Sequence, residues 1–156
     1  MFSQTVEYAL RAMMHLASAG GAAETGDKIA SATRVPPGYL SKVMRDLVLA
    51  GLVRSFRGPN GGFTLARPVA DISILDVVTA VDPIRRIDRC PIDDPHHTDL
   101  CALHRRLDDA LAIVEQTFRA TSLADVLRGN GRSDGCQHLK PTQSLDQSGD
   151  SHAPAA

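Results

Sequence analysis

The feature that most constrains the fold is a change of pattern at Gly51. Residues 38–51 (GYLSKVMRDLVLAG) carry apolar side chains at helical spacing, and a glycine is suited to end a helix. The next segments, LVRSF and FTLARP, are strand-like, and the turn residues GPNGG lie between them. A tight hairpin turn there is expected to use positive φ at Asn60-Gly61. The helix side chains expected to face inward are Leu40, Val43, Leu47 and Leu49 or Ala50.

Two further helices are expected before this helix and hairpin. Asp27 is suited to cap a short helix over KIASAT. Arg34-Val35-Pro36-Pro37 predicts a rigid turn, because a proline disfavours helical geometry in the preceding residue and is accepted at a helix start. Helix, turn, helix and basic hairpin is the order of a winged helix-turn-helix. Residues 3–18 are expected to form the first helix, with Val6, Leu10, Met13 and Ala17 on one face.

The second half of the chain is expected to be helical on both sides of a loop. Residues 71–82 predict a helix capped by Ser73, and the proline-rich, charged residues 83–99 predict the loop. A short helix, LADVLR, is expected between Ser122 as its cap and Gly129 as its stop. Residues 100–119 predict a long helix whose apolar seam is of the kind that pairs with a second helix. The seam consists of Leu103, Leu107, Ala110 or Leu111, Val114 and Phe118.

Composition agrees with a mostly helical fold. Apolar residues make up 43% of the chain and aromatic residues only 4%, so Ala, Leu, Val and Ile must build the core. We expect a winged helix-turn-helix domain over residues 1–82, a sensor or cofactor loop over 83–99, and a dimerisation helix with a final short helix over 100–128. The tail over 129–156, rich in Ser, Gly, Asp and Gln, is expected to be disordered.

Charge is distributed unevenly along the chain. The formal net charge is -1, yet residues 28–67 hold seven basic residues against one acidic residue, Asp46, a net of +6. A local basic excess of this kind indicates a nucleic-acid partner.

The first turn of the helix after the two prolines is the expected DNA reader. A helix fits the major groove of B-DNA, and its first turn points side chains at base edges. An arginine on the thin hairpin can enter a narrow minor groove. A helix-turn-helix also serves as a protein-interaction module without DNA, which stays an alternative. The expected DNA-binding residues are Lys28, Tyr39, Ser41, Lys42, Arg54, Arg57, Gly58 and Asn60.

Other classes of protein are disfavoured. The sequence has no phosphate-cradling G-x-x-x-x-G-K-S/T loop and no G-x-S-x-G nucleophile elbow, so no enzyme is expected. No apolar run is long enough to span a bilayer and no secretory signal is visible, which predicts a cytoplasmic protein with reduced thiols. Its three cysteines, Cys90, Cys101 and Cys136, therefore suit ligands or redox groups better than a disulfide framework.

The segment from Cys90 to His104 (CPIDDPHHTDLCALH) concentrates sulfur and imidazole side chains. Cys101 and His104 are three residues apart, so both can lie on one helical face and converge on one ion, and Cys90 can approach from the loop. Two thiolates and a histidine suit an iron–sulfur cluster or zinc better than a hard cation.

Several motifs, in order, resemble those of the IscR/NsrR-type winged-helix repressors, the Rrf-two family. They are EYALRA at residues 7–12, Gly38-Tyr39-Leu40, the wing RSFRGPNGGF at 54–63 with LARP at 65–68, LDVV at 75–78, and Cys101-Ala-Leu-His104. The match covers roughly residues 2–128. The resemblance implies a homodimer that binds a dyad-symmetric operator on double-stranded DNA, with the long helix as dimer contact. It places Tyr39, Ser41 and Lys42 at the major groove and Arg57 at the minor groove.

The resemblance also implies a [2Fe–2S] or [4Fe–4S] cluster that senses redox state, nitric oxide or iron. Many members of this family carry three cysteines in this segment, whereas here the middle cysteine is absent and His96 or His97 stands near its place. In some relatives an acidic residue of the first helix supplies a ligand across the dimer, and Glu7 occupies that position. The implied ligands are Cys90, Cys101, Glu7 and one of His104, His96 or His97. Zinc, or a metal-free thiol or small-molecule switch, are the alternatives.

Overall fold

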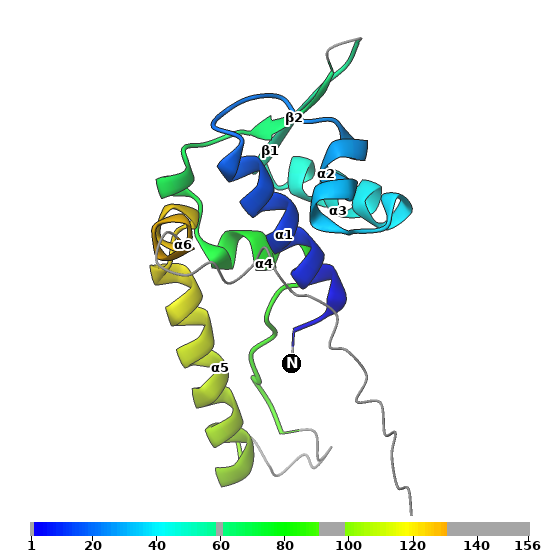
Figure 1. Ribbon diagram of the computed structural model, residues 1–156. Coiled ribbons are helices and arrows are strands. Elements are labelled where there is room, and N and C mark those ends of the chain that lie inside the picture. The colour runs from blue at the N-terminus through cyan, green and yellow to red at the C-terminus, as the bar shows by residue number, and fades with distance from the viewer. Residues whose placement is uncertain (1, 59–60, 91–98, 131–156) are drawn as a thin grey trace, which may run out of the picture.

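The computed structural model describes residues 2–58, 61–90 and 99–130. Within these ranges the chain forms six α-helices, a 3-10 helix and a two-stranded antiparallel sheet, which confirms a mostly helical winged fold (Figure 1). The elements are α1 Gln4–Ser18, α2 Gly26–Thr33, α3 Pro37–Leu49, β1 Val53–Phe56, β2 Gly62–Leu65, η1 Val69–Asp71, α4 Ile74–Val81, α5 Ala102–Ala120 and α6 Leu123–Asn130.

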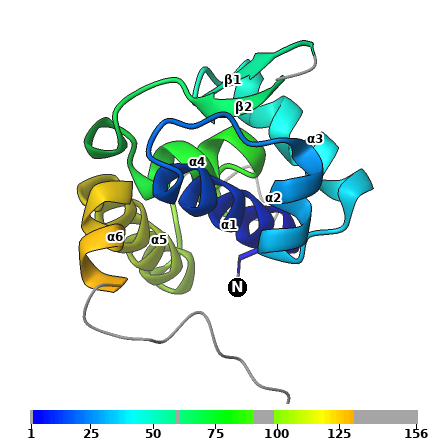
Figure 2. The same ribbon diagram turned by 45° about the horizontal axis from the view of Figure 1, so that its top comes forward.

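Helix α1 is the centre of the core. It packs against α2, α3, α4 and α6, and Figures 1 and 2 show it surrounded by these elements. Val6, Met13 and Ala17 are buried as predicted, and Leu10 is half-buried against the same core. Leu123 of α6 is fully buried in that core too, so the last helix closes the winged-helix core rather than extending from it.

The helix starts follow capping chemistry, with one correction. Ser3 and Ser73 cap α1 and α4 through their hydroxyls, and Ser73 with Asp76 forms a complete capping box. The predicted cap Asp27 is wrong, because Thr25 has the extended backbone of a cap and accepts from the Lys28 amide at 3.3 Å. Asp27 lies instead in the first turn, where the positive end of the helix dipole stabilises its carboxylate.

The inward face of α3 also needs correction. Leu40, Val43 and Leu47 are buried as predicted, but Leu49 is 74% exposed and Ala50 is also exposed. Leu49 follows Leu47 by two residues and so points to roughly the opposite side of the helix. Met44, one residue after Val43, completes the buried face.

The β-hairpin, or wing, pairs Val53 with Leu65 and Phe56 with Gly62. Residues 57–61 connect the strands, so the loop is longer than the tight turn that was predicted. Positive φ occurs at Gly58, at 113°, while Asn60 lies outside the described residues. Gly61 is required for space, since a Cβ there would lie 2.6 Å from the Phe56 carbonyl oxygen.

The base of the wing is attached to the loop between α1 and α2. Glu24 and Phe63 exchange backbone hydrogen bonds of 3.0 and 2.8 Å across an isolated antiparallel bridge. This contact links the wing to the helical core, and no local pattern in the sequence predicts it.

Helix α5 stands apart from the core (Figure 1). It packs mainly on α4, and none of its residues, all of which are described, is buried.

The final helix, capped by Ser122 as predicted, continues through Gly129 to Asn130, so glycine does not stop it. The predicted disorder of residues 129–156 is therefore wrong at residues 129 and 130, which belong to α6, and residues 131–156 lie outside the described part of the chain. Among the described helices, none combines the length and the apolar character that crossing a membrane requires.

Candidate DNA interface and metal centre

The first turn of α3 presents the predicted DNA-reading side chains. Helix α3 begins at Pro37, and Tyr39, Ser41 and Lys42 are exposed on it. Figure 1 shows α2, α3 and the wing on one side of the molecule, with α5 on the other. This arrangement leaves the helix start and the wing accessible to a duplex.

Helix α1 supports the ring of Tyr39. The ring meets that of Tyr8 edge to face at a centroid distance of 5.3 Å, and its hydroxyl lies 3.3 Å from Thr5 Oγ1. Gln4 donates to the Tyr8 hydroxyl at 2.7 Å. No local pattern in the sequence predicts this contact between α1 and α3, the expected recognition helix.

Ser41 has part of its hydrogen-bonding capacity occupied. Its hydroxyl donates to the Pro37 carbonyl at 3.0 Å, so in this rotamer the oxygen can only accept a bond from a base or phosphate partner. Lys28, Arg54, Arg57 and Gly58 are exposed, the last three on the wing and the first on α2. Asn60 lies outside the described residues.

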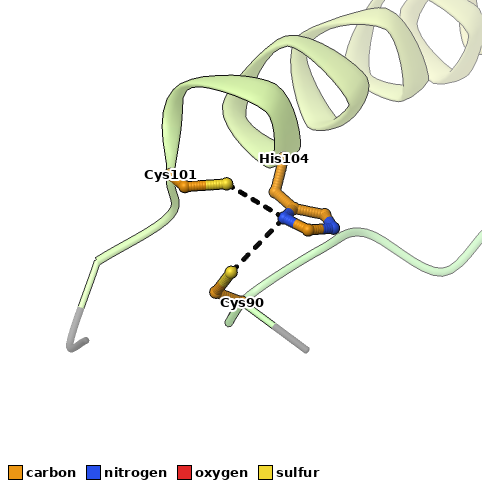
Figure 3. Close-up of side chains that lie close together, drawn as sticks. All are labelled: Cys90, Cys101 and His104. Atoms are coloured by element: carbon orange, nitrogen blue, oxygen red, sulfur yellow. Dashed lines mark hydrogen bonds between the residues drawn. The ribbon is translucent and has the colours of Figure 1, made fainter. Parts of the chain in front are cut away.

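Cys90, Cys101 and His104 converge at the N-terminal end of α5 (Figure 3). The His104 Nδ1 atom lies 3.1 Å from the Cys101 sulfur and 3.4 Å from the Cys90 sulfur. One ligand atom from each residue lies within 4.8 Å of the others, which is the only such metal-ligand group among the described residues. We call these three residues the Cys/His centre.

Local structure explains two of the three positions. Cys101 is the N-cap of α5, with φ −62° and ψ 164°, and His104 follows three residues later on the first turn. A cap side chain and the third helical residue face each other, as in a capping box. Cys90 arrives from the segment after α4 and is 7% exposed.

The electrostatic setting of Cys101 favours its thiolate. The pKa of the Cys101 thiol is lowered to about 6, chiefly by the backbone amide of His104 and then by the imidazole of the same residue. Helix N-termini and nearby imidazoles lower thiol pKa values in this way. A deprotonated sulfur is the form that binds metal.

The other predicted ligands are placed differently or not described. Glu7 is exposed on α1, and its carboxylate pairs with Arg11 at 2.9 Å on the same helix. Within one copy of the chain, Glu7 does not belong to the Cys/His centre. His96, His97 and Cys136 lie outside the described residues.

Comparison with known proteins identifies the family to which the chain is similar. The sequence model of the Rrf2 family, described as an iron-dependent transcriptional regulator, matches residues 2–129. An HTH-type transcriptional regulator of Mycobacterium tuberculosis (strain H37Rv) is 37% identical over 130 residues, covering 81% of each chain.

Solved structures match the fold. CymR, the global cysteine regulator of B. subtilis, superposes with a TM-score of 0.69 at 24% identity, covering 83% of this chain and 97% of that one. IscR of T. potens gives a TM-score of 0.68 at 25% identity and covers 83% of this chain and 88% of that one.

Proposed function

This chain belongs to the Rrf2 family of DNA-binding transcriptional regulators, and we propose that it is a dimeric repressor whose Cys/His centre controls its binding to a dyad-symmetric operator. The observation that carries the proposal is the convergence of Cys90, Cys101 and His104 at the start of α5. Because Cys101 caps this helix, a change in ligation acts directly on its first turn.

The DNA part of the proposal depends on α3 and the wing. Tyr39, Ser41 and Lys42 are exposed on the turn that would enter the major groove, and the exposed Arg57 of the wing would reach the minor groove. Lys28 and Arg54 add positive charge beside them, suited to phosphates. Binding should therefore weaken steeply with salt, and a salt-independent affinity for duplex DNA would contradict this role.

The dimer part depends on the exposed side of α5. Leu103 and Ile113 are each 65% exposed and Leu107 is 48% exposed, and together with the exposed Ala110 they form a stripe at helical spacing. Ile113 was not part of the predicted seam, which contained Val114 instead, and Val114 is half-buried. Phe118 of that seam packs on Phe2 of its own chain, with ring centroids 5.1 Å apart. A second copy of the chain is the occupant that we propose for the stripe.

For the cofactor we propose an iron–sulfur cluster. Two sulfurs and an imidazole within 4.8 Å form a soft donor set that fits such a group. Cys90, Cys101 and His104 would hold it, with a fourth ligand from Glu7 of a second copy or from His96 or His97. When bound, the cluster supplies one-electron redox chemistry. The chain itself contributes the helix whose first turn carries two of the ligands.

A metal-free thiol switch is the second candidate, and the closeness of Cys90 to Cys101 favours it. Their two thiols can form a disulfide by losing two protons and two electrons to hydrogen peroxide, which is reduced to two molecules of water. This reaction would also change the structure at the start of α5.

The cofactor is tested by purifying the protein without oxygen, recording its ultraviolet–visible absorption spectrum, and assaying iron and sulfide on the same sample. Stoichiometric iron and sulfide that the variant C90S/C101S lacks would support the cluster. A colourless, iron-free protein whose operator binding still responds to peroxide would support the thiol switch. Operator binding that responds identically to oxidant and nitric oxide in the wild type and in C90S/C101S would contradict both.

A further inference from the structure

The segment between α4 and Cys90 is attached to α5 through Arg86 and Ile87. Arg86 donates to both oxygens of the Asp108 carboxylate, from Nε at 2.7 Å and from Nη2 at 2.5 Å. The backbone amide of Ile87 donates to the same carboxylate at 2.9 Å, and Arg86 Nη1 lies 3.7 Å from Glu115. We call the contact of Arg86 and Ile87 with Asp108 the clasp.

Asp108 is held in its charged form. Its pKa is lowered to about 2, first by the hydrogen bonds from Arg86 and then by the Ile87 amide. Two parallel hydrogen bonds between a guanidinium and a carboxylate fix orientation as well as distance, unlike a single ion pair. The clasp therefore fixes both the position and the direction of the segment at Arg86.

The clasp lies beside the Cys/His centre. Asp108 follows His104 by four residues on α5, so the two side chains are one turn apart on the same face. Arg86 precedes Cys90 by four residues in a segment without helix or strand. Cys101 and His104 take their places from α5 itself, whereas Cys90 belongs to this segment.

We infer that Arg86 and Asp108 are positioning residues that hold Cys90 against Cys101 and His104. A ligand on an irregular segment must be ordered before it can share an ion, and the clasp orders it in advance. The metal-binding consequence rests on the proposed function, but the positioning of Cys90 does not. Arg86 is 43% exposed and neither partner belongs to the core, so losing the pair should leave the fold intact.

Thiol accessibility in reduced, metal-free protein tests the positioning directly. Cys90 is nearly buried and Cys101 is half-buried, so the ratio of their N-ethylmaleimide reaction rates reports opening of the segment. In D108N and R86Q we expect Cys90 to react about tenfold faster relative to Cys101. The control is D109N, because Asp109 pairs with Arg106 at 4.0 Å on the exposed side of the same helix. Peptide mapping by mass spectrometry assigns each modified cysteine.

Cobalt binding tests the consequence for the centre. Co²⁺ titrated into reduced protein should show thiolate charge-transfer absorption in the wild type and in D109N. In D108N and R86Q this absorption should fall to about half, as Cys90 leaves the ion, with affinity about tenfold weaker. The exchanged pair R86D/D108R should recover part of both losses, and it replaces D108N if that variant fails to fold.

The outcomes separate the two ideas. If Cys90 reacts at the wild-type rate in folded D108N and R86Q, the clasp does not position it and the inference is overturned. If Cys90 becomes reactive in these variants but wild-type protein binds neither Co²⁺ nor iron, the inference stands and the proposed metal centre fails.

Discussion

Cys101 takes a position at which helices usually have Ser, Thr, Asp or Asn. Its sulfur faces the amide and the ring of His104, the two largest of the causes that lower its pKa to about 6. The residue therefore combines the capping position of α5 with the chemistry of a metal ligand. A cap of this kind lets the helix start respond to what the sulfur binds.

Alkylation of metal-free, reduced protein should reveal this thiolate. Because the pKa is lowered, the thiolate is present above about pH 6 and is lost as the pH falls through that value. The iodoacetamide rate at Cys101 should thus have its midpoint near pH 6, against about 8.5 for an ordinary cysteine. In H104A the midpoint should rise only partway, since the larger cause, the backbone amide, remains. A midpoint at the ordinary value in the wild type would contradict this assignment.

Sequence spacing predicted that Cys101 and His104 lie together in the Cys/His centre. It did not predict the contacts that hold Cys90 beside them. Cys101 and His104 are three residues apart, and helical geometry alone brings them together. Cys90 depends on Arg86 and Asp108, which are 22 residues apart and give no local signal. The Tyr39 hydroxyl beside Thr5, 34 residues away, was hidden for the same reason.

At the scale of elements, periodicity located the helices, while tertiary contacts decided their ends and attachments. Thr25 and Asp27 are both suited to cap a helix, and the helix start moves by two residues depending on which of them is the cap. The bridge of Glu24 to Phe63 joins the wing to a loop that carries no strand pattern. Long-range backbone pairing of this kind cannot be predicted from the residues on either side.

The wing should depend on Gly62 for space. A Cβ at Gly62 would lie 2.6 Å from the Glu24 carbonyl oxygen, so G62A must displace the bridge that anchors the wing. We expect thermal unfolding to show destabilisation of about 1–3 kcal/mol, as for overpacked sites. Gly38 in α3 has open space around its Cβ position, so G38A should be neutral or more stable by up to about 1 kcal/mol. Equal unfolding midpoints for the two variants would refute the close approach.

The start of α6 should be sensitive to acid. Asp125 accepts from the Ser122 amide at 2.9 Å and hydroxyl at 2.6 Å and pairs with Arg128, and its pKa is lowered to about 2, chiefly by Ser122. Its contribution to stability is complete above the ordinary pKa of about 3.9 and is lost as the pH falls towards 2. D125N should therefore reduce the dependence of the unfolding temperature on pH in that window. A pH dependence identical to that of the wild type would exclude the contribution of Asp125.

At the scale of the whole molecule, the hydrophobic core and helix α5 have separate functions. The buried residues of α1, α3, α4 and α6 form one hydrophobic cluster. Helix α5, all of whose residues are described, contributes no buried residue to it. Folding of the winged helix therefore does not use the α5 stripe. The apolar side chains of that stripe remain available for a second copy, with the Cys/His centre at the beginning of the same helix.

Charge placed in the stripe should separate the dimer without unfolding the protomer. L107E puts a carboxylate at an exposed position that two copies would bring together, and Leu107 is absent from the core. Q116E adds the same charge at an exposed site further round α5 and serves as the control. Analytical ultracentrifugation should find L107E monomeric and Q116E dimeric, with similar unfolding temperatures.

Because two recognition helices about 34–36 Å apart must engage both half-sites together, L107E should bind the operator about 10²–10⁴-fold more weakly. A dimeric L107E would transfer the interface to another surface, and a monomeric L107E with wild-type operator affinity would mean that one protomer suffices for binding.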